Sequence, residues 1–409
     1  MIKEFKITNF FSIKDTQTIS FNIKKKDMLD QSSFISPCKN KLNNIIALIG
    51  NNASGKTTVL KGLSFLLWFI SSSYQKLDIN SKIPLQPHKL SQKKNSKFEL
   101  IFEQNNKEYQ YITELNANEV IYEFLGVKKE RGYSYLYEYK REKDEIFFSK
   151  WALSKLNDDD KNRYKERKNA SLFSFLISTG HLPAIGLKSV ETYQTNIGGL
   201  GRVPFDMLQM FFELSHTLNN DEKRKNAILK YIKSFGLGVE NFEIEDADIG
   251  IGIGFLDGSS SEHRNKMKAL NITHKSDDGN FKLLFLEESN GTQNAIYLLN
   301  SIFSILDKGG ILIYDEIENS IHPYLIKKVV NLLANKETNP NNAQLIFSTH
   351  QPWLLDDRTK TQIYIVEKNE KLETQAFILD TFDGVRNDDN FCAKYLAGAY
   401  GGVSDVRWF

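Results

Sequence analysis

The sequence feature that most constrains the fold is the octapeptide Gly50-Asn-Asn-Ala-Ser-Gly-Lys-Thr57, which fits the pattern G-x-x-x-x-G-K-[ST] at every position. Its glycines allow backbone N–H groups to turn inward around a phosphate, and a helix that begins there points its positive end at the same phosphate. The apolar run Ile45–Ile49 before it is typical of a buried strand, and a helix of roughly 57–73 should follow. The pattern therefore predicts a phosphate-binding loop in an α/β domain.

The residues of this loop indicate Mg-ATP as the ligand. The Lys56 ammonium would reach the β- and γ-phosphate oxygens, and the Thr57 hydroxyl would ligate Mg²⁺. The predicted nucleotide-binding residues are Gly50, Asn51, Asn52, Ala53, Ser54, Gly55, Lys56, Thr57 and Thr58. ATP and Mg²⁺ are therefore the expected cofactors.

Two further apolar runs end in residues that suit ATP hydrolysis. The run Ile311–Tyr314 is followed by Asp315, a candidate Mg²⁺ carboxylate, and by Glu316, a candidate general base for the attacking water. The run that begins at Gln344 ends in Ser-Thr-His350, and a histidine there can contact the γ-phosphate or position water. The predicted catalytic residues are thus Lys56, Glu316 and His350.

A fourth motif, Glu-Glu-Ser289-Asn-Gly291-Thr, precedes an amphipathic segment of residues 293–307 that should be a helix. A serine at a helix start is often only an N-cap, which needs no ligand. The same position is also an anion site. Because it lies between the phosphate loop and the Asp-Glu pair, we interpret Ser289 and Gly291 as nucleotide contacts.

With these four motifs in this order, the chain resembles ABC-type ATPase heads of the SMC/RecF/OLD group. It is more similar still to stand-alone ATPases of anti-phage systems of the RloA, AbiL and PARIS type. Shared features are the opening Ile-x-x-Phe-x-Ile-x-Asn-Phe, the Glu-Ser-x-Gly-Thr signature, Asp-Glu-Ile-Glu-x-x-x-His-Pro, Ser-Thr-His and the closing Tyr400-Gly-Gly. The middle, 130–280, adds little that is specific.

The resemblance implies a homodimer or higher oligomer in which Ser289 completes the nucleotide site of the opposite subunit. It also implies a separately encoded effector, of TOPRIM or another nuclease type, because no nuclease domain fits into the 59 residues after His350. Gln86 lies where the magnesium-binding glutamine of such heads is expected.

Composition agrees with a soluble, cytoplasmic protein. The 409 residues carry 53 basic and 51 acidic side chains, so a net charge of +2 does not by itself announce a nucleic-acid binder, although contact with nucleic acid is possible. Two distant cysteines give neither a zinc ribbon nor a disulfide framework. The longest apolar stretch, near 63–70, is far shorter than the ~20 residues that span a bilayer, so we expect no membrane contact.

The predicted fold class is α/β: an ABC-type P-loop ATPase head of mixed sheet plus antiparallel β lobe, with a helical insertion. The N-terminal half of the head, with the phosphate loop, is assigned to residues 1–130. A mixed hairpin and helical insertion follows at 131–240, and the C-terminal half of the head, with the other three motifs, is 241–409.

Alternatives from other classes remain open at this stage. A RecF-like clamp would use ATP-driven closure to grip DNA in repair, and the basic run Lys161–Lys168 would suit such a contact as well as a solvated helix face. A GTPase is the weaker alternative, because Asn335-Lys-Glu-Thr338 lacks the aspartate that reads guanine. The tyrosines at 133, 135, 137 and 139 can stack bases, but covering a core is the commoner use of such a face.

Overall fold

The computed structural model describes residues 1–24, 29–143, 145–149, 156–181, 192–198, 201–202, 207–247 and 267–403. The chain divides into two compact units. The first comprises residues 1–202, 305–317 and 330–409, and the second comprises 203–304 and 318–329. The sequence-based division at 130/131 and 240/241 stays a prediction.

The first unit contains a six-stranded sheet in the order β11-β17-β18-β5-β19-β20. All its neighbours are parallel except β19 and β20, which form a hairpin. Its strands are β5 (Ile45–Ile49), β11 (Tyr193–Thr195), β17 (Ile311–Tyr314), β18 (Gln344–Thr349), β19 (Ile363–Lys368) and β20 (Thr374–Ile378). The apolar runs of β5, β17 and β18 are buried along their whole length, as expected for central parallel strands.

The same unit contains a seven-stranded antiparallel sheet in the order β10-β9-β8-β7-β6-β1-β2. Its strands are β1 (Ile2–Thr8), β2 (Gln17–Ser20), β6 (Ser96–Gln104), β7 (Lys107–Leu115), β8 (Val120–Lys129), β9 (Gly132–Lys140) and β10 (Glu145–Phe148). Alternating burial along β6 and β7 shows that one face of this sheet covers a core.

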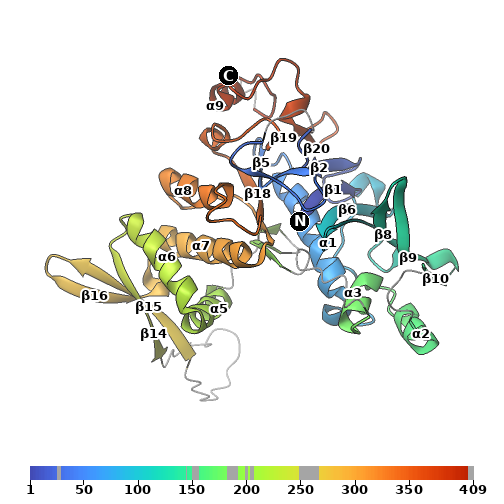
Figure 1. The fold of residues 1–409 in the computed structure, drawn as a ribbon, viewed down its shortest axis with the longest axis horizontal. Coiled ribbons are helices and arrows are strands. Elements are labelled where there is room, and N and C mark those ends of the chain that lie inside the picture. The colour runs from blue at the N-terminus through green and yellow to red at the C-terminus, as the bar shows by residue number, and fades with distance from the viewer. Residues whose placement is uncertain are drawn as a thin grey trace. The chain divides into compact units, whose positions relative to one another are not determined.

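Helix α1 (Lys56–Lys76) begins directly after the phosphate loop and touches both sheets, β17 and β18 on one side and β1 on the other (Figure 1). Its apolar side chains, with those of β1, β6 and β7, belong to one continuous core. The helix therefore ties the phosphate loop to the antiparallel sheet.

Smaller elements complete the first unit: β3 (Ser33–Ile35), β4 (Lys41–Asn43), α2 (Asp158–Glu166), α3 (Leu172–Ser178), β12 (Ile197–Gly198), β13 (Gly201–Arg202) and α9 (Phe391–Leu396). Short 3₁₀ turns occupy Lys89–Ser91, Arg141–Lys143, Pro352–Leu355 and Leu379–Thr381. Helix α3 is held by the fully buried Glu123 of β8, whose carboxylate accepts hydrogen bonds from the backbone N–H groups of Leu172 and Phe173.

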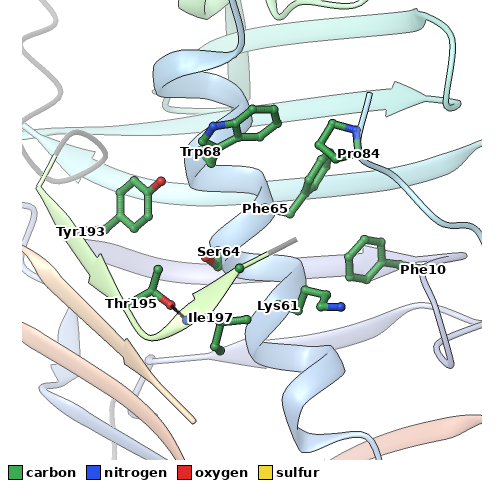
Figure 2. Close-up of a pocket in the computed structure, with 10 residues that line it drawn as sticks. Phe10, Lys61, Ser64, Phe65, Trp68, Pro84, Tyr193, Thr195 and Ile197 are labelled. Carbon is green, nitrogen blue, oxygen red and sulfur yellow. Dashed lines mark hydrogen bonds between the residues drawn. The ribbon is translucent and has the colours of Figure 1, made fainter. Parts of the chain in front are cut away.

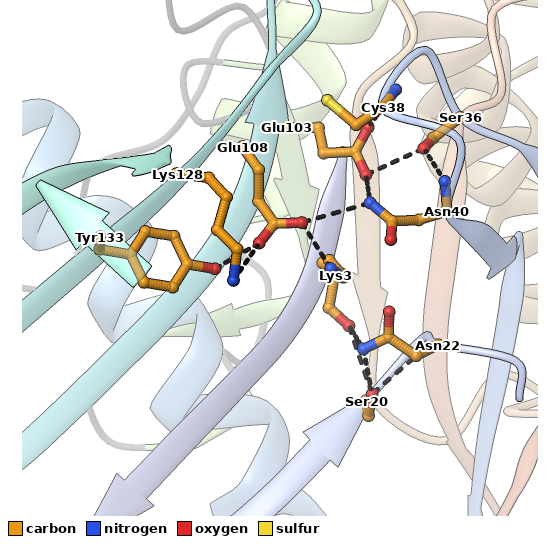
Figure 3. A network of polar contacts seen from close by, with 10 residues as sticks. All are labelled: Lys3, Ser20, Asn22, Ser36, Cys38, Asn40, Glu103, Glu108, Lys128 and Tyr133. Atoms are coloured by element: carbon orange, nitrogen blue, oxygen red, sulfur yellow. Dashed lines mark hydrogen bonds and ion pairs between the residues drawn. The ribbon is translucent and has the colours of Figure 1, made fainter. Parts of the chain in front are cut away.

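A polar network joins the inner strands of the antiparallel sheet to the β3–β4 hairpin (Figure 3). At its centre, Glu108 of β7 pairs with Lys3 and accepts a hydrogen bond from Tyr133. Burial by itself would raise the pKa of Glu108, but these two hydrogen bonds and the nearby charge of Lys128 outweigh it and hold the pKa below its usual value.

The second unit carries a three-stranded antiparallel sheet of β14 (Val239–Ala247), β15 (Met267–Ser276) and β16 (Gly279–Leu284). Helices α5 (Met207–Asn220) and α6 (Glu222–Ser234) pack against β14 and β15, and a 3₁₀ turn follows at Phe285–Glu287. Helix α7 (Asn290–Lys308) begins in this unit, and α8 (Pro323–Ala334) begins in its second segment. Stacked and edge-on contacts of Phe285 with Phe211 and Tyr297 fill its core.

The predicted α/β fold, with a mixed sheet, an antiparallel β lobe and further helices, is confirmed. Two details of the predicted elements were wrong. The alternating pattern of residues 133–148 predicts one strand, but the structure has two strands there, β9 and β10, separated by a 3₁₀ turn. The helix expected from 293 starts three residues earlier, at Asn290. The sequence pattern also predicts a strand over 242–253 and an amphipathic helix over 205–218. The strand lies in β14 as far as Ala247, and residues 248–253 and 205–206 are outside the described residues.

Candidate active site

The phosphate loop lies between β5 and α1, and its two glycines are needed for steric reasons. A Cβ on Gly50 would lie 1.9 Å from the Val366 carbonyl oxygen of β19. A Cβ on Gly55 would lie 2.0 Å from the Thr374 hydroxyl of β20, and Gly55 has φ +107°, a conformation that L side chains rarely adopt. The β19–β20 hairpin therefore packs directly against the loop.

Two polar groups of the loop suit an anionic ligand. Lys56 is buried, and its ammonium donates to the carbonyls of Gly50 (2.8 Å) and Asn51 (3.0 Å), which holds the charge inside the loop. The Ser54 hydroxyl is buried and has no hydrogen-bond partner among the described residues. An unpaired buried hydroxyl beside a lysine, at the start of a 21-residue helix, matches the requirements of a bound phosphate.

Asp315 is held at the carboxyl end of β17, next to the start of α1. Its carboxylate accepts hydrogen bonds from the hydroxyls of Thr57 (2.9 Å) and Ser348 (2.5 Å). The Asn196 amide, which follows β11, accepts from the Asp315 backbone N–H (2.7 Å) and donates to its carbonyl (2.9 Å). Neighbouring parallel strands thus fix both the main chain and the side chain of Asp315, as a metal-directed carboxylate requires.

Glu316 points in another direction because its backbone is left-handed, with φ +50°. Its N–H donates to the Ser348 hydroxyl (2.8 Å), the same hydroxyl that donates to Asp315. The Glu316 carboxylate lies 3.7 Å from the imidazole Nε2 of His350, and both side chains are partly exposed to solvent. A carboxylate and an imidazole placed in this way can orient and deprotonate a water molecule.

These groups line one cavity of ≈ 510 Å³. Its walls are Ser12, Asn52, Ala53, Ser54, Gly55, Lys56, Thr57, Thr58, Asp315, Glu316, His350 and Lys368. The structure thus brings most of the predicted loop residues together with the Asp-Glu pair and His350. Gly50 and Asn51 are not in its wall, but their carbonyls accept from Lys56.

Sequence reasoning missed the residues that support the loop from the far side. The Thr374 hydroxyl donates to the Ser54 carbonyl (3.0 Å), contacts the Ser12 hydroxyl (2.8 Å) and accepts from the Lys368 ammonium (2.9 Å). Burial lowers the pKa of Lys368. Ser12 follows the opening Asn-Phe-Phe, a motif that the sequence alone does not place beside the phosphate loop.

Two sets of predicted residues do not line this cavity. Gln86 is half-buried, and its backbone carbonyl accepts a hydrogen bond from the Phe11 N–H (2.8 Å). Its role at magnesium stays a prediction, without support from the cavity walls. Ser289 and Gly291 belong to the second unit. There the Ser289 hydroxyl accepts from the Thr292 N–H (3.2 Å) and caps the start of α7, and a Cβ on Gly291 would lie 2.7 Å from the Ser320 carbonyl oxygen.

The fold and the site together define a P-loop ATPase. The chain belongs to the family described as "AAA domain, putative AbiEii toxin, Type IV TA system", whose model matches residues 45–356, more than half of the sequence. It is accordingly an ATP hydrolase. No helix among the described residues is long and apolar enough to cross a membrane, and no cluster of three metal-ligating side chains is found there.

Individual relatives are more distant. The "Retron Vc95 probable ATPase" of Vibrio cholerae serotype O1 biovar El Tor is 23% identical over 381 residues, which cover 80% of this chain and 69% of that protein. Similar solved structures include the SMC head domain from Thermotoga maritima, with a TM-score of 0.40, 14% identity and coverage of 92% of this chain and 98% of that chain. An SmcHead bound to the C-winged helix domain of ScpA has a TM-score of 0.44 and 11% identity and covers 92% and 96%.

Proposed function

We propose that this chain is a Mg-ATP-dependent switch in bacterial anti-phage defence. Two copies close head to head around ATP, hydrolysis separates them, and the closed state controls a separately encoded effector, a nuclease. The observation that carries the proposal is that Thr57, Asp315, Glu316 and His350 all line the same cavity over the phosphate loop.

The site's residues have distinct roles in hydrolysis. Lys56 neutralises phosphate charge, and Thr57 and Asp315 are the side chains that would hold Mg²⁺. The metal ion supplies charge stabilisation to the transferring phosphoryl group. Glu316 takes the proton of the attacking water, and His350 orients that water or contacts the γ-phosphate.

The signature turn supports a site shared between two copies. Ser289 and Asn290 are exposed at the N-terminus of the 19-residue helix α7. That helix end and the serine hydroxyl together suit a phosphate of a second molecule. In this arrangement Ser289 of one copy covers the γ-phosphate bound by Lys56 of the other, so hydrolysis needs both copies.

The relatives support the proposed setting. The family's description names a Type IV toxin–antitoxin system, and the Vibrio cholerae relative is described as the ATPase of a retron. The motifs shared with RloA-, AbiL- and PARIS-type ATPases agree with a defence role and with an effector on another chain.

The first test traps the closed dimer. Glu316→Gln keeps the side chain's size but removes the general base, so ATP should still bind while turnover falls by about 10²–10⁴-fold. Light scattering should then show a dimer of the variant in Mg-ATP and a monomer in Mg-ADP. Glu130→Gln, at an exposed position between β8 and β9 and outside the cavity walls, is the matched control. A Glu316→Gln chain that stays monomeric in saturating ATP argues against head-to-head closure.

The second test asks whether the site is shared. Lys56→Ala removes the phosphate contact, and Ser289→Arg blocks the turn, so each variant alone should be inactive. A mixture of the two should regain up to a quarter of the wild-type rate per dimer, because half of the dimers are mixed and each has one intact site. No recovery, with mixed dimers shown by differential tagging, removes the support for a shared site.

The effector is tested by purification from the native gene neighbourhood. A tagged chain with Glu316→Gln in Mg-ATP should bring down a neighbouring gene product in stoichiometric amount, and Lys56→Ala should not. The copurified protein should degrade nucleic acid in a nucleotide-dependent way. A stable partner without nuclease activity would leave the switch intact and remove the nuclease from the proposal.

A further inference from the structure

A second cavity, of ≈ 330 Å³, lies on the first unit next to the P-loop helix (Figure 2). Its walls are Phe10, Lys61, Ser64, Phe65, Trp68, Pro84, Tyr193, Thr195, Ile197 and Gly198. None of these residues lines the cavity over the phosphate loop. On α1, Thr57 and Thr58 line the first cavity, whereas Lys61 and Trp68, further along the same helix, line the second. At 1.5 Å per residue, Trp68 is about 16 Å along the helix from Thr57.

Four of the ten residues that line this pocket are aromatic. Figure 2 shows Tyr193 on one side and Phe10 on the other, with Trp68 and Phe65 rising from α1 between them. The ring centroids of Phe65 and Trp68 are 6.0 Å apart, and those of Phe10 and Phe65 are 5.9 Å apart. Flat walls of this kind bind planar aromatic groups by stacking and edge contacts. The volume is at the lower end of that seen for small-molecule pockets.

Lys61 gives the pocket a positive charge that no carboxylate of the described residues balances. The residue is only 7% exposed, and its ammonium has no hydrogen-bond or ion-pair acceptor among the described residues. Its one described contact is the face of the Phe11 ring, 3.9 Å from the ring centroid. Partial burial lowers the pKa of Lys61, so removing its charge from water has a cost, and the cation–π contact offsets only part of that cost. An anionic ligand would supply the missing acceptor.

The hydroxyls of Ser64 and Tyr193 can form hydrogen bonds with the polar edge of a nucleobase. The Ser64 hydroxyl lines the pocket and can donate or accept. Burial raises the pKa of Tyr193 to about 12, so its phenol stays protonated and can donate. We propose that this pocket binds a nucleobase that carries a phosphate, with the base against Phe65, Trp68 and Tyr193 and the phosphate on Lys61. Its source is a free nucleotide or one nucleotide of a single strand.

The pocket also adjoins the hydrolytic site through β11. Thr195 and Ile197 of its wall flank Asn196, whose amide holds both backbone polar groups of Asp315. A ligand seated against Thr195 and Ile197 therefore changes the rate of ATP hydrolysis. This coupling rests on the proposed function, whereas binding itself does not.

The test measures binding with the phosphate loop already occupied. The full chain in saturating Mg-ADP is titrated by calorimetry with dTMP, thymidine and a 5′-phosphorylated tetrathymidylate. We expect dTMP or the tetranucleotide to bind with one site per chain and thymidine to bind at least tenfold more weakly. Equal affinity for dTMP and the tetranucleotide identifies a free nucleotide as sufficient, and binding of the tetranucleotide alone identifies a strand.

Matched variants assign the binding to this pocket. Lys61→Met keeps the length of the side chain and should weaken nucleotide binding at least tenfold, Lys61→Arg should restore most of it, and Lys76→Met, an exposed lysine of the same helix, should change nothing. Circular dichroism melting checks that each variant is folded. Absence of nucleotide binding, or binding that Lys61→Met leaves unchanged, overturns the proposal. So does Lys61-dependent binding of an acidic aromatic peptide such as N-acetyl-Glu-Phe-amide in place of nucleotides, which would make the pocket a protein-docking site.

The ATPase rate separates the two proposals. If Glu316→Gln lowers turnover as proposed and dTMP binds the wild-type chain in Mg-ADP, both the hydrolytic role of Glu316 and the nucleotide pocket are supported. If the mixing experiment with Ser289 fails while dTMP binding persists, only the shared site is lost. If dTMP does not bind while the mixed dimers recover activity, only the nucleotide pocket is lost.

Discussion

At the scale of single residues, the hydrolytic site depends on one hydroxyl that sequence reasoning passed over. Ser348 was read only as part of the Ser-Thr-His motif, yet its hydroxyl donates to the Asp315 carboxylate and accepts from the Glu316 N–H. It thereby keeps two adjacent acidic side chains in different directions and restrains the left-handed backbone of Glu316.

Asn196 should matter for turnover more than for nucleotide affinity. Asn196→Ala removes both hydrogen bonds to the Asp315 backbone, each worth about 1 kcal/mol, so Asp315 is less well positioned. We expect kcat to fall about tenfold or more, since 1.4 kcal/mol corresponds to a factor of ten, while the Kd for ATP changes little. Steady-state ATPase assays and ATP titrations check this, with Gln194→Ala, exposed on the preceding strand β11, as control. A weaker Kd with unchanged kcat contradicts it.

The phosphate loop was predictable because its residues are contiguous and each has a local steric or charge requirement. The same holds for Asp315 and Glu316, which end an apolar run. Asn196, Lys368 and Thr374 were not predictable, because each joins the site from a distant segment through its side chain alone. No spacing rule links residues that meet only after the sheet order β11-β17-β18-β5-β19-β20 is formed.

At the scale of elements, periodicity identified most strands but not their irregularities. Tyr137 and Tyr139 are buried as a core face should be, whereas Tyr135 is 44% exposed. The cause is a register shift in the β8–β9 pairing between Leu125 and Gly126, opposite Tyr137 and Tyr135. A bulge changes the side of the sheet that following side chains face, and an alternating pattern of tyrosines gives no sign of it.

The packing of α1 on β1 depends on a missing side chain. A Cβ on Gly62 would lie 2.4 Å from the Ile7 Cδ1, although the Gly62 backbone is helical. Gly62→Ala alone should be destabilising by about 1 kcal/mol, since overpacking costs about 1–3 kcal/mol and better helix propensity returns about 1. In an Ile7→Val background, which lacks that methyl group, Gly62→Ala should instead stabilise. Urea unfolding of all four chains gives the coupling energy, and equal effects in both backgrounds would refute the steric explanation.

The network around Glu108 should make the stability of the antiparallel sheet sensitive to acid (Figure 3). Because its folded pKa is lowered, Glu108 contributes stability that is present above the unfolded value near 4.5 and is lost as pH falls through the folded pKa. Glu108→Gln should therefore lower the free energy of unfolding at pH 7 and make it less dependent on pH below 4.5. Urea unfolding from pH 3 to pH 7 measures this, with exposed Glu130→Gln as control. Parallel pH profiles for wild type and variant would contradict it.

At the scale of the whole molecule, the balance of basic and acidic residues distinguishes the proposed ATP-driven switch from a DNA clamp. A clamp that closes on duplex DNA needs several phosphate contacts, each of which adds to a steep dependence of affinity on salt. The chain carries 53 basic and 51 acidic residues, and many of its surface lysines are paired with carboxylates, such as Lys233 with Glu240 and Lys268 with Asp246. A field that is balanced in this way gives little attraction for a polyanion.

We therefore expect the Glu316→Gln chain in Mg-ATP to bind a 30-base-pair duplex no more tightly than ordinary non-specific binders, with a Kd on the order of 10⁻⁴–10⁻⁶ M at physiological salt. Fluorescence anisotropy at several salt concentrations measures both the Kd and the salt slope, and Lys56→Ala shows whether either depends on ATP. A nanomolar, ATP-dependent affinity with a steep slope would favour the clamp and displace the effector from the proposed function. Weak binding would agree with ATP-driven closure that controls a partner protein rather than duplex DNA.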